Sequence, residues 1–85
     1  MKFIAEIDIM PKQELLDPQG KTVTASMKNL DLEGIEDVRI GKHIQMTLEA
    51  DSEAAANEKV ETACQKLLAN IIMENYSYSI ISAES

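Results

Sequence analysis

A glycine between two cations interrupts the most regular strand pattern of this 85-residue chain. Alternation with a period of two is typical of a half-buried strand, and here one parity continues across Gly41 and Lys42. A glycine inside a strand indicates either a turn or the close approach of another backbone. The pattern therefore requires one long strand or two strands that share a face. The apolar residues of this parity are Val38, Ile40, Ile44, Met46 and Leu48.

Two backbone conformations preserve this parity. Residues 36–50 can form a single long strand bent at Gly41, or a hairpin whose three-residue loop 41–43 pairs residue 40 with 44 and 38 with 46. A two-residue loop at 41–42 would instead pair Ile40 with His43 and mix polar with apolar residues on one face. The tighter turn is therefore excluded, and the other two conformations stay open.

The first helix is predicted from a local signal. Asp17 is expected to be its N-cap, with its carboxylate accepting a hydrogen bond from the amide of Gly20. Pro18 then occupies the first helical position, where its missing N–H costs nothing. Val23, Met27 and Leu30 follow as one apolar stripe, and the helix is expected to end near residues 30–32.

Alternation and composition predict the other elements. Residues 2–10 alternate as a strand that ends at Pro11, and residues 74–82 alternate again. Residues 53–69 are rich in helix formers and follow two capping candidates, Asp51 and Ser52. The apolar stripe of this second helix is predicted to consist of Val60, Cys64, Leu67 and Ile71, with Ala56, Ala63 and Leu68 beside it.

The order β-α-β(β)-α-β predicts an α+β fold, a two-layer sandwich with two helices on one face of a mainly antiparallel sheet. The length fits a single domain, residues 1–85. Ile4, Met10 and Ile81 fall on the opposite face of the sheet. A second copy of the chain is the natural cover for that face, so a homodimer is expected.

Charge excludes several classes of partner. The chain has 15 acidic and 8 basic residues, a net charge of −7, and three aromatic residues. Neither a basic patch nor a base-stacking platform is available, so nucleic acid and anionic membranes are not expected partners. No apolar run approaches the roughly 20 residues of a membrane span, and a cytoplasmic protein is expected.

Few residues could carry chemistry. The single histidine, His43, has no evident partner, and we expect an ordinary exposed or interface residue. The single cysteine, Cys64, lies on an apolar stripe and is expected in the core. One cysteine and one histidine cannot form a disulfide or a Cys/His metal cluster, so no cofactor or metal is expected in this chain.

Three features remain as contact candidates. Arg39 and Lys42 flank Gly41 and could bind a phosphate or a partner carboxylate, or could be solvated cations in a turn. Gly20 in the first helical turn costs up to ~1 kcal/mol relative to alanine and suggests close approach by another backbone. Tyr76 and Tyr78 suit a half-wet interface.

Four segments, in their order and spacing, resemble one family over essentially the whole chain. They are Leu16-Asp17-Pro18-Gln19-Gly20, Asp37-Val38-Arg39-Ile40-Gly41-Lys42, Lys66-Leu67-Leu68-Ala69-Asn70 and Glu74-Asn75-Tyr76-Ser77-Tyr78. Together they are similar to PurS, the small subunit of phosphoribosylformylglycinamidine synthase, which is also called formylglycinamide ribonucleotide amidotransferase.

The resemblance implies a role in de novo purine biosynthesis. The enzyme complex converts formylglycinamide ribonucleotide, ATP and glutamine to formylglycinamidine ribonucleotide, ADP, phosphate and glutamate. A glutaminase subunit releases ammonia, and a large synthetase subunit uses ATP and Mg. The small subunit forms homodimers or higher assemblies, joins the other two subunits and assists ammonia transfer, without catalytic residues of its own. The expected interface residues are Asp17, Pro18, Gln19, Gly20, Arg39, Gly41, Lys42, Tyr76 and Tyr78.

A rival prediction is a small homodimeric regulatory module that binds a metabolite at its dimer interface. It would bind glutamine, ADP or the ribonucleotide saturably without other subunits. An independent enzyme has little support, because no nucleophile, base and orienting group can be assembled from this sequence.

Overall fold

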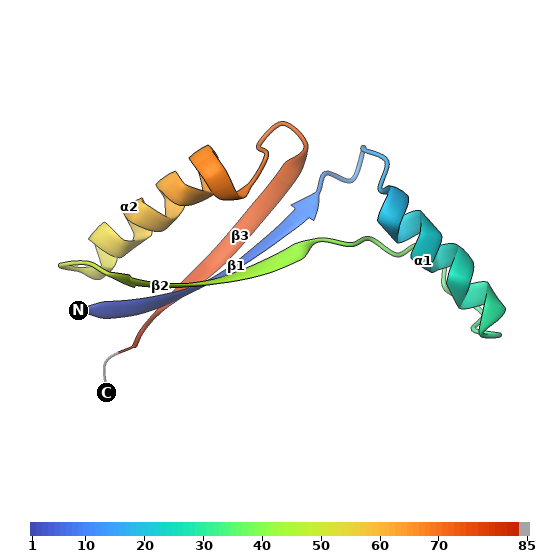
Figure 1. Ribbon diagram of the computed structural model, residues 1–85, viewed down its shortest axis with the longest axis horizontal. Coiled ribbons are helices and arrows are strands. Elements are labelled where there is room, and N and C mark those ends of the chain that lie inside the picture. The colour runs from blue at the N-terminus through green and yellow to red at the C-terminus, as the bar shows by residue number, and fades with distance from the viewer. Residues whose placement is uncertain (84–85) are drawn as a thin grey trace.

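The computed structural model describes residues 1–83 and has the predicted order of elements (Figure 1). Its strands form one antiparallel sheet in the order β2-β1-β3, so β1 is central and both of its neighbours are edge strands. The α+β class and the antiparallel sheet are therefore confirmed. The elements are β1 (Lys2–Pro11), α1 (Pro18–Asn29), β2 (Lys42–Glu49), α2 (Glu53–Ala63), the π-helical turn η1 (Cys64–Leu68) and β3 (Glu74–Ser82).

The core lies between the sheet and α2. Odd-numbered residues of β1 point toward α2, and Ala5, Ile7 and Ile9 are fully buried there. Ile7 lies opposite Ile44 on β2 and Tyr78 on β3, so one layer of the core runs across all three strands. Period-two alternation in β1 thus produces the buried face that the sequence predicts.

The predicted position of the first helix is wrong. Only α2 covers the sheet, whereas α1 lies beyond the end of the sheet (Figure 1). Its apolar stripe is accordingly outside the core: Val23 and Met27 are only half-buried, and Leu30 is 67% exposed. The helix is held instead by hydrogen bonds that the amides of Val38 and Ile40 donate to the side chains of Thr24 and the N-cap Asp17.

The segment before β2 is a bent extension of that strand. A hairpin is excluded, because β2 begins at Lys42 and pairs only with β1. Residues 35–41 are outside the sheet and run alongside α1 in Figure 1. The shared parity of Val38, Ile40 and Ile44 therefore reflects one continuous extended chain, of which only the second part is in the ladder.

The end of the second helix also differs from the prediction. Ala56, Val60 and Cys64 are buried, but Leu67 is 81% exposed and Ile71 is 54% exposed. The cause is η1, in which the amide of Ala69 donates to the carbonyl of Cys64, five residues earlier. A π-helical turn adds one residue to the turn, so the buried position after Cys64 passes to Leu68 and Ala69.

This register shift predicts unequal effects for two residues of the predicted stripe. Val60→Ala leaves a cavity in the core and is expected to lower the free energy of unfolding by about 2 kcal/mol. Leu67→Ala is expected to change it by no more than about 0.5 kcal/mol, as for other exposed sites. Urea denaturation of both variants measures the difference, and equal losses would show that the helix continues without the π turn.

Candidate functional site

Most of the predicted contact residues gather where α1 meets the segment 38–41, which we call the helix junction (residues 17–24 and 38–41). Asp17 is its centre. The Asp17 side chain is buried: its Oδ1 accepts from the Gly20 amide at 3.1 Å, as predicted, and its Oδ2 accepts from the Ile40 amide at 2.7 Å. These two bonds, first from Ile40 and then from Gly20, lower the pKa of Asp17, and Arg39 contributes in the same direction. Asp17, the N-cap of α1, therefore also binds the segment 38–41, which is distant in the sequence.

Gly20 is the point of closest approach in the helix junction. A Cβ on this residue would overlap the carbonyl oxygen of Val38. One turn later, the Thr24 hydroxyl donates to the Gly20 carbonyl at 2.8 Å and accepts from the Val38 amide at 2.9 Å. The close backbone approach predicted at Gly20 is confirmed, and the approaching backbone is that of residue 38.

Arg39 is engaged inside the chain. Its Nη2 donates to the carbonyls of Lys12 at 2.8 Å and Leu15 at 3.3 Å. Both acceptors lie in the connection between β1 and α1, so the guanidinium ties this connection to the helix junction. Carbonyl oxygens therefore occupy the Nη2 donors, whereas Nε is buried without a hydrogen-bond partner among the described residues.

The remaining predicted contact residues near the helix junction differ in exposure. A Cβ at Gly41 would overlap the Ile9 carbonyl and the Met10 sulfur, so close packing accounts for this glycine. Lys42, Pro18 and Gln19 are exposed around the helix junction. Their side chains remain available for a partner, whereas Asp17 and Gly20 are buried.

The two tyrosines lie apart from the helix junction, on β3 beneath α2. Their rings stack with centroids 6.4 Å apart. The Tyr76 hydroxyl donates to Glu61 Oε1 at 2.7 Å, and the Tyr78 hydroxyl lies 2.8 Å from Glu61 Oε2. Burial and then Glu61 raise the pKa of Tyr78 to about 12, while Tyr76 and Tyr78 lower the pKa of Glu61. The pair anchors α2 to the sheet of its own chain.

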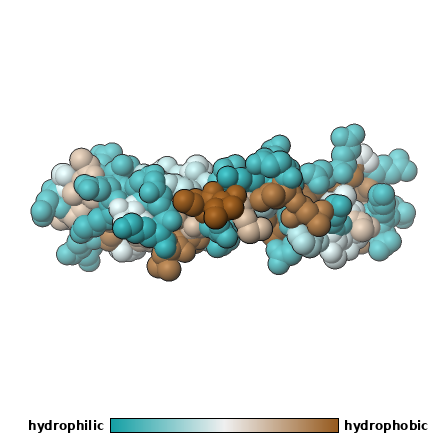
Figure 2. Space-filling model, turned by 90° about the horizontal axis from the view of Figure 1, so that it is seen from above, coloured by the Kyte–Doolittle hydropathy of each residue, from teal (hydrophilic) through white to brown (hydrophobic). Residues whose placement is uncertain are grey.

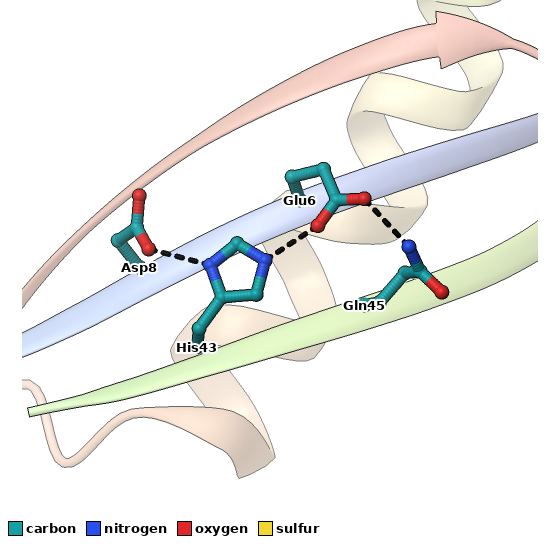
Figure 3. A network of polar contacts seen from close by, with 4 residues as sticks. All are labelled: Glu6, Asp8, His43 and Gln45. Carbon is teal, nitrogen blue, oxygen red and sulfur yellow. Dashed lines mark hydrogen bonds and ion pairs between the residues drawn. The ribbon is translucent and has the colours of Figure 1, made fainter.

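A polar network on the open face of the sheet was missed by sequence reasoning (Figure 3). His43 on β2 lies between two carboxylates of β1: its Nδ1 is 2.6 Å from Asp8, and its Nε2 is 2.5 Å from Glu6. Gln45 donates to the other oxygen of Glu6 at 2.7 Å. The register places Asp8 opposite His43 and Glu6 opposite Gln45. In the sequence, alternation within each strand already placed Glu6 with Asp8, and His43 with Gln45, on the polar face, and this was the one indication of the network.

The network predicts a pH-dependent stability. Asp8, and then Glu6, raise the pKa of His43 above its ordinary value of 6.5. Gln45, and then His43, lower the pKa of Glu6 below 4.5. The contribution of His43 to the free energy of unfolding is therefore present below pH 6.5 and is lost as the pH rises through the raised pKa of His43. The contribution of Glu6 is present above pH 4.5 and is lost as the pH falls through the lowered pKa of Glu6.

We expect His43→Gln to destabilise the fold most between pH 4.5 and pH 6.5, and less once the pH has risen above the raised pKa of His43, where the imidazole is neutral in both states. Urea denaturation across pH measures the difference between variant and wild type. A difference that does not change with pH would contradict the charged network.

The two residues with potential for acid–base or nucleophilic chemistry lie on opposite faces of the sheet. His43 is on the open face, and Cys64, the first residue of η1, is fully buried on the face that α2 covers, where burial raises the pKa of its thiol. Within residues 1–83, no group of three or more His, Cys, Asp or Glu side chains could hold a metal ion. Nor does this part of the chain contain a helix both long and apolar enough to cross a membrane.

The family described as "PurS: Phosphoribosylformylglycinamidine (FGAM) synthase" matches residues 4–82. The chain therefore belongs to the PurS family, as its sequence segments predict.

Individual relatives agree along almost the full length. The chain is 42% identical over 82 residues to the phosphoribosylformylglycinamidine synthase subunit PurS of Synechocystis sp., covering 96% of this chain and 82% of that protein. Its identity to the Bacillus subtilis subunit is 38%, with 92% of each chain covered. A solved structure of B. subtilis PurS superimposes with a TM-score of 0.85 at 32% identity, covering 94% of this chain and 99% of the other.

A further solved structure contains a relative within a complex. The fold is similar to a chain in the structure of PurLQS from Thermotoga maritima, with a TM-score of 0.86 and 28% identity. The match covers 95% of this chain and 99% of that chain.

Proposed function

We propose that this chain is the small subunit of a multi-subunit phosphoribosylformylglycinamidine synthase in de novo purine biosynthesis. The observation that carries the proposal is the near full-length similarity to a chain of the PurLQS assembly. The complex would convert formylglycinamide ribonucleotide, ATP and glutamine to formylglycinamidine ribonucleotide, ADP, phosphate and glutamate. The chain would work in the cytoplasm.

Its role in that complex is non-catalytic. The placement of His43 and Cys64 on opposite faces supports this role, because neither has the other as a partner for chemistry. ATP and Mg would be bound by the large synthetase subunit. This chain would hold the glutaminase and synthetase subunits together and assist the passage of ammonia between them, with Pro18 and Gln19 offering exposed contacts at the helix junction and Lys42 offering one beside it, at the start of β2.

A homodimer would cover the open face of the sheet. Helix α2 covers one face, and the other face carries Ile4, Met10 and Ile81 around the His43 network. Met10 is 40% exposed and Ile81 is 58% exposed. Covering these residues with a second copy would supply burial that an 85-residue chain otherwise lacks.

Co-elution tests the proposed role. The chain is mixed with candidate glutaminase and synthetase subunits, glutamine and Mg-ADP, and the mixture is separated by size-exclusion chromatography. One peak that contains all three proteins is expected, whereas separate elution would contradict the proposal. Calorimetric titration of the isolated chain with glutamine, ADP and the ribonucleotide tests the rival regulatory module, which predicts saturable binding.

A further inference from the structure

Strand β3 is an edge strand that lacks the usual protection of an exposed sheet edge. Its nine residues pair with β1 in one unbroken register, without a bulge. It contains no proline and no basic residue, and its one charged residue, Glu74, is at the end of the strand. Natural proteins protect exposed edges with charges, prolines or bulges, because unpaired backbone groups there can bind another strand. The outer edge of β3 is therefore a candidate contact surface.

The hydrogen bonds at the two ends of β3 show which backbone groups face this outer edge. The Ala83 amide donates to the Lys2 carbonyl, and the Lys12 amide donates to the Met73 carbonyl, both at 2.9 Å. Hydrogen-bonded and non-hydrogen-bonded pairs alternate along an antiparallel ladder, so the odd-numbered residues of β3 bind β1. The even-numbered residues direct their N–H and C=O groups outward. They are Glu74, Tyr76, Tyr78, Ile80 and Ser82.

The opposite edge of the sheet, on β2, is better protected. The Ala50 amide donates to the Met1 carbonyl, so by the same alternation the odd-numbered residues of β2 face outward. One of their carbonyls, that of Glu49, accepts from Lys59 Nζ at 2.9 Å. Charged side chains stand at both ends of this strand, Lys42 and Glu49. An added strand is therefore expected at β3 and not at β2.

We propose that the outer edge of β3 pairs antiparallel with β3 of a second copy of this chain, which joins the two sheets into one. Because β3 has nine residues, the two-fold axis of a full-length pairing passes through its middle residue, Tyr78. This register sets Tyr76 opposite Ile80 and Ser77 opposite Ser79. Outward amides then meet outward carbonyls along the whole strand.

The residues that this register brings together are compatible. On the face that α2 covers, the Tyr78 rings of the two copies lie opposite each other, and aromatic pairs across strands are stabilising. Glu74 lies opposite the hydroxyl of Ser82, so no like charges meet along the edge, although each chain has a net charge of −7. The strand is therefore complementary to itself, and a second copy is the occupant that it fits.

This edge contact differs from the homodimer contact proposed for the open face. Both copies keep α2 on the same side of the joined sheet, so the open face stays available. The outer surface of α2, on the left of Figure 2, is mainly hydrophilic and offers no apolar face to another copy. Its exposed residues include Glu53, Asn57, Glu58 and Lys59. The inference does not depend on the proposed function, because the isolated chain suffices to test it.

Hydrogen exchange of the isolated wild-type chain tests the pairing, since a contact through the open face would leave the outer edge in water. In a concentrated sample, in which light scattering shows associated chains, we expect the amides of Tyr76, Tyr78 and Ile80 to exchange at least about tenfold more slowly than in a dilute, dissociated sample. The inward amides of Ser77 and Ser79 should be protected in both samples. Unprotected outward amides in the associated sample, or no association at all, would overturn the inference.

Ile80→Pro, compared with Ile80→Ala, tests the same contact by substitution. Both changes remove part of a side chain that packs on the core. Only proline removes an outward N–H and places its ring on the free edge, where an edge strand tolerates it. In light scattering we expect Ile80→Ala to keep the molar mass of the associated wild type and Ile80→Pro to have about half of it.

Two further results would count against a second copy as the occupant. Equal molar masses for the two variants would contradict edge pairing. Outward amides that become protected only when the glutaminase and synthetase subunits are added would identify a strand of another subunit as the occupant. The proposed function is unaffected by either result, because joining the complex is measured separately by co-elution.

Discussion

Gly20→Ala is expected to destabilise the protein, although the same change stabilises an ordinary helix by about 1 kcal/mol. The added methyl group would overlap the Val38 carbonyl, and overpacking of this kind costs about 1–3 kcal/mol. To relieve it, α1 must move away from the segment 38–40 and weaken the bonds that hold it there. Set against the gain in helix propensity, we expect a net loss of about 1 kcal/mol in the free energy of unfolding and the earliest loss of hydrogen-exchange protection at the amides of Val38 and Ile40.

The sign of the change in stability shows whether the helix propensity of alanine or its overlap with the Val38 carbonyl dominates at residue 20. Thermal unfolding measures it, and a loss of about 1 kcal/mol corresponds to a fall of roughly 4–8 °C in Tm for a domain of this size. Lys21→Ala is the control, because Lys21 is exposed on the same helical turn. A Gly20→Ala variant as stable as the wild type would show that α1 is free to shift away from Val38 at no cost.

The parts of the fold that could be predicted are set by interactions between residues close together in the sequence. Alternation predicted β1 and β3 because the pleat itself has a period of two. Asp17 and Pro18 predicted the start of α1 because a cap and a first-turn proline act within one turn. The position of α1 could not be predicted, because it depends on bonds between Asp17 and Ile40 and between Thr24 and Val38, which lie far apart in sequence.

The site was partly predictable for the same reason. Close approach at Gly20 followed from the cost of glycine in a helix, but the identity of the approaching backbone did not. Predicting the partners of His43 would have required the pairing register of β2 on β1, and alternation alone does not give that register. The π turn at Cys64 has no clear signature in sequence, and one added residue moved Leu67 from the core to the surface.

Removing the chain from a reconstituted complex is expected to have the largest functional effect. The proposed role is to align the glutaminase and synthetase subunits, so its loss should misplace the two active sites relative to each other. Misplacement of reacting groups by about 1 Å can cost about 10²-fold in rate, and we expect at least this loss of glutamine-dependent turnover. Turnover with added ammonia should change little, because free ammonia reaches the synthetase site without a second subunit.

The ratio of glutamine-dependent to ammonia-dependent turnover, measured with and without this chain, tests the central claim most directly. Both rates are followed as ADP release by the same mixture of glutaminase and synthetase subunits. A subunit that joins the two enzymes predicts a ratio that falls about 10²-fold when the chain is omitted and recovers when it is added back. An unchanged ratio, or an equal fall in both rates, would contradict the account.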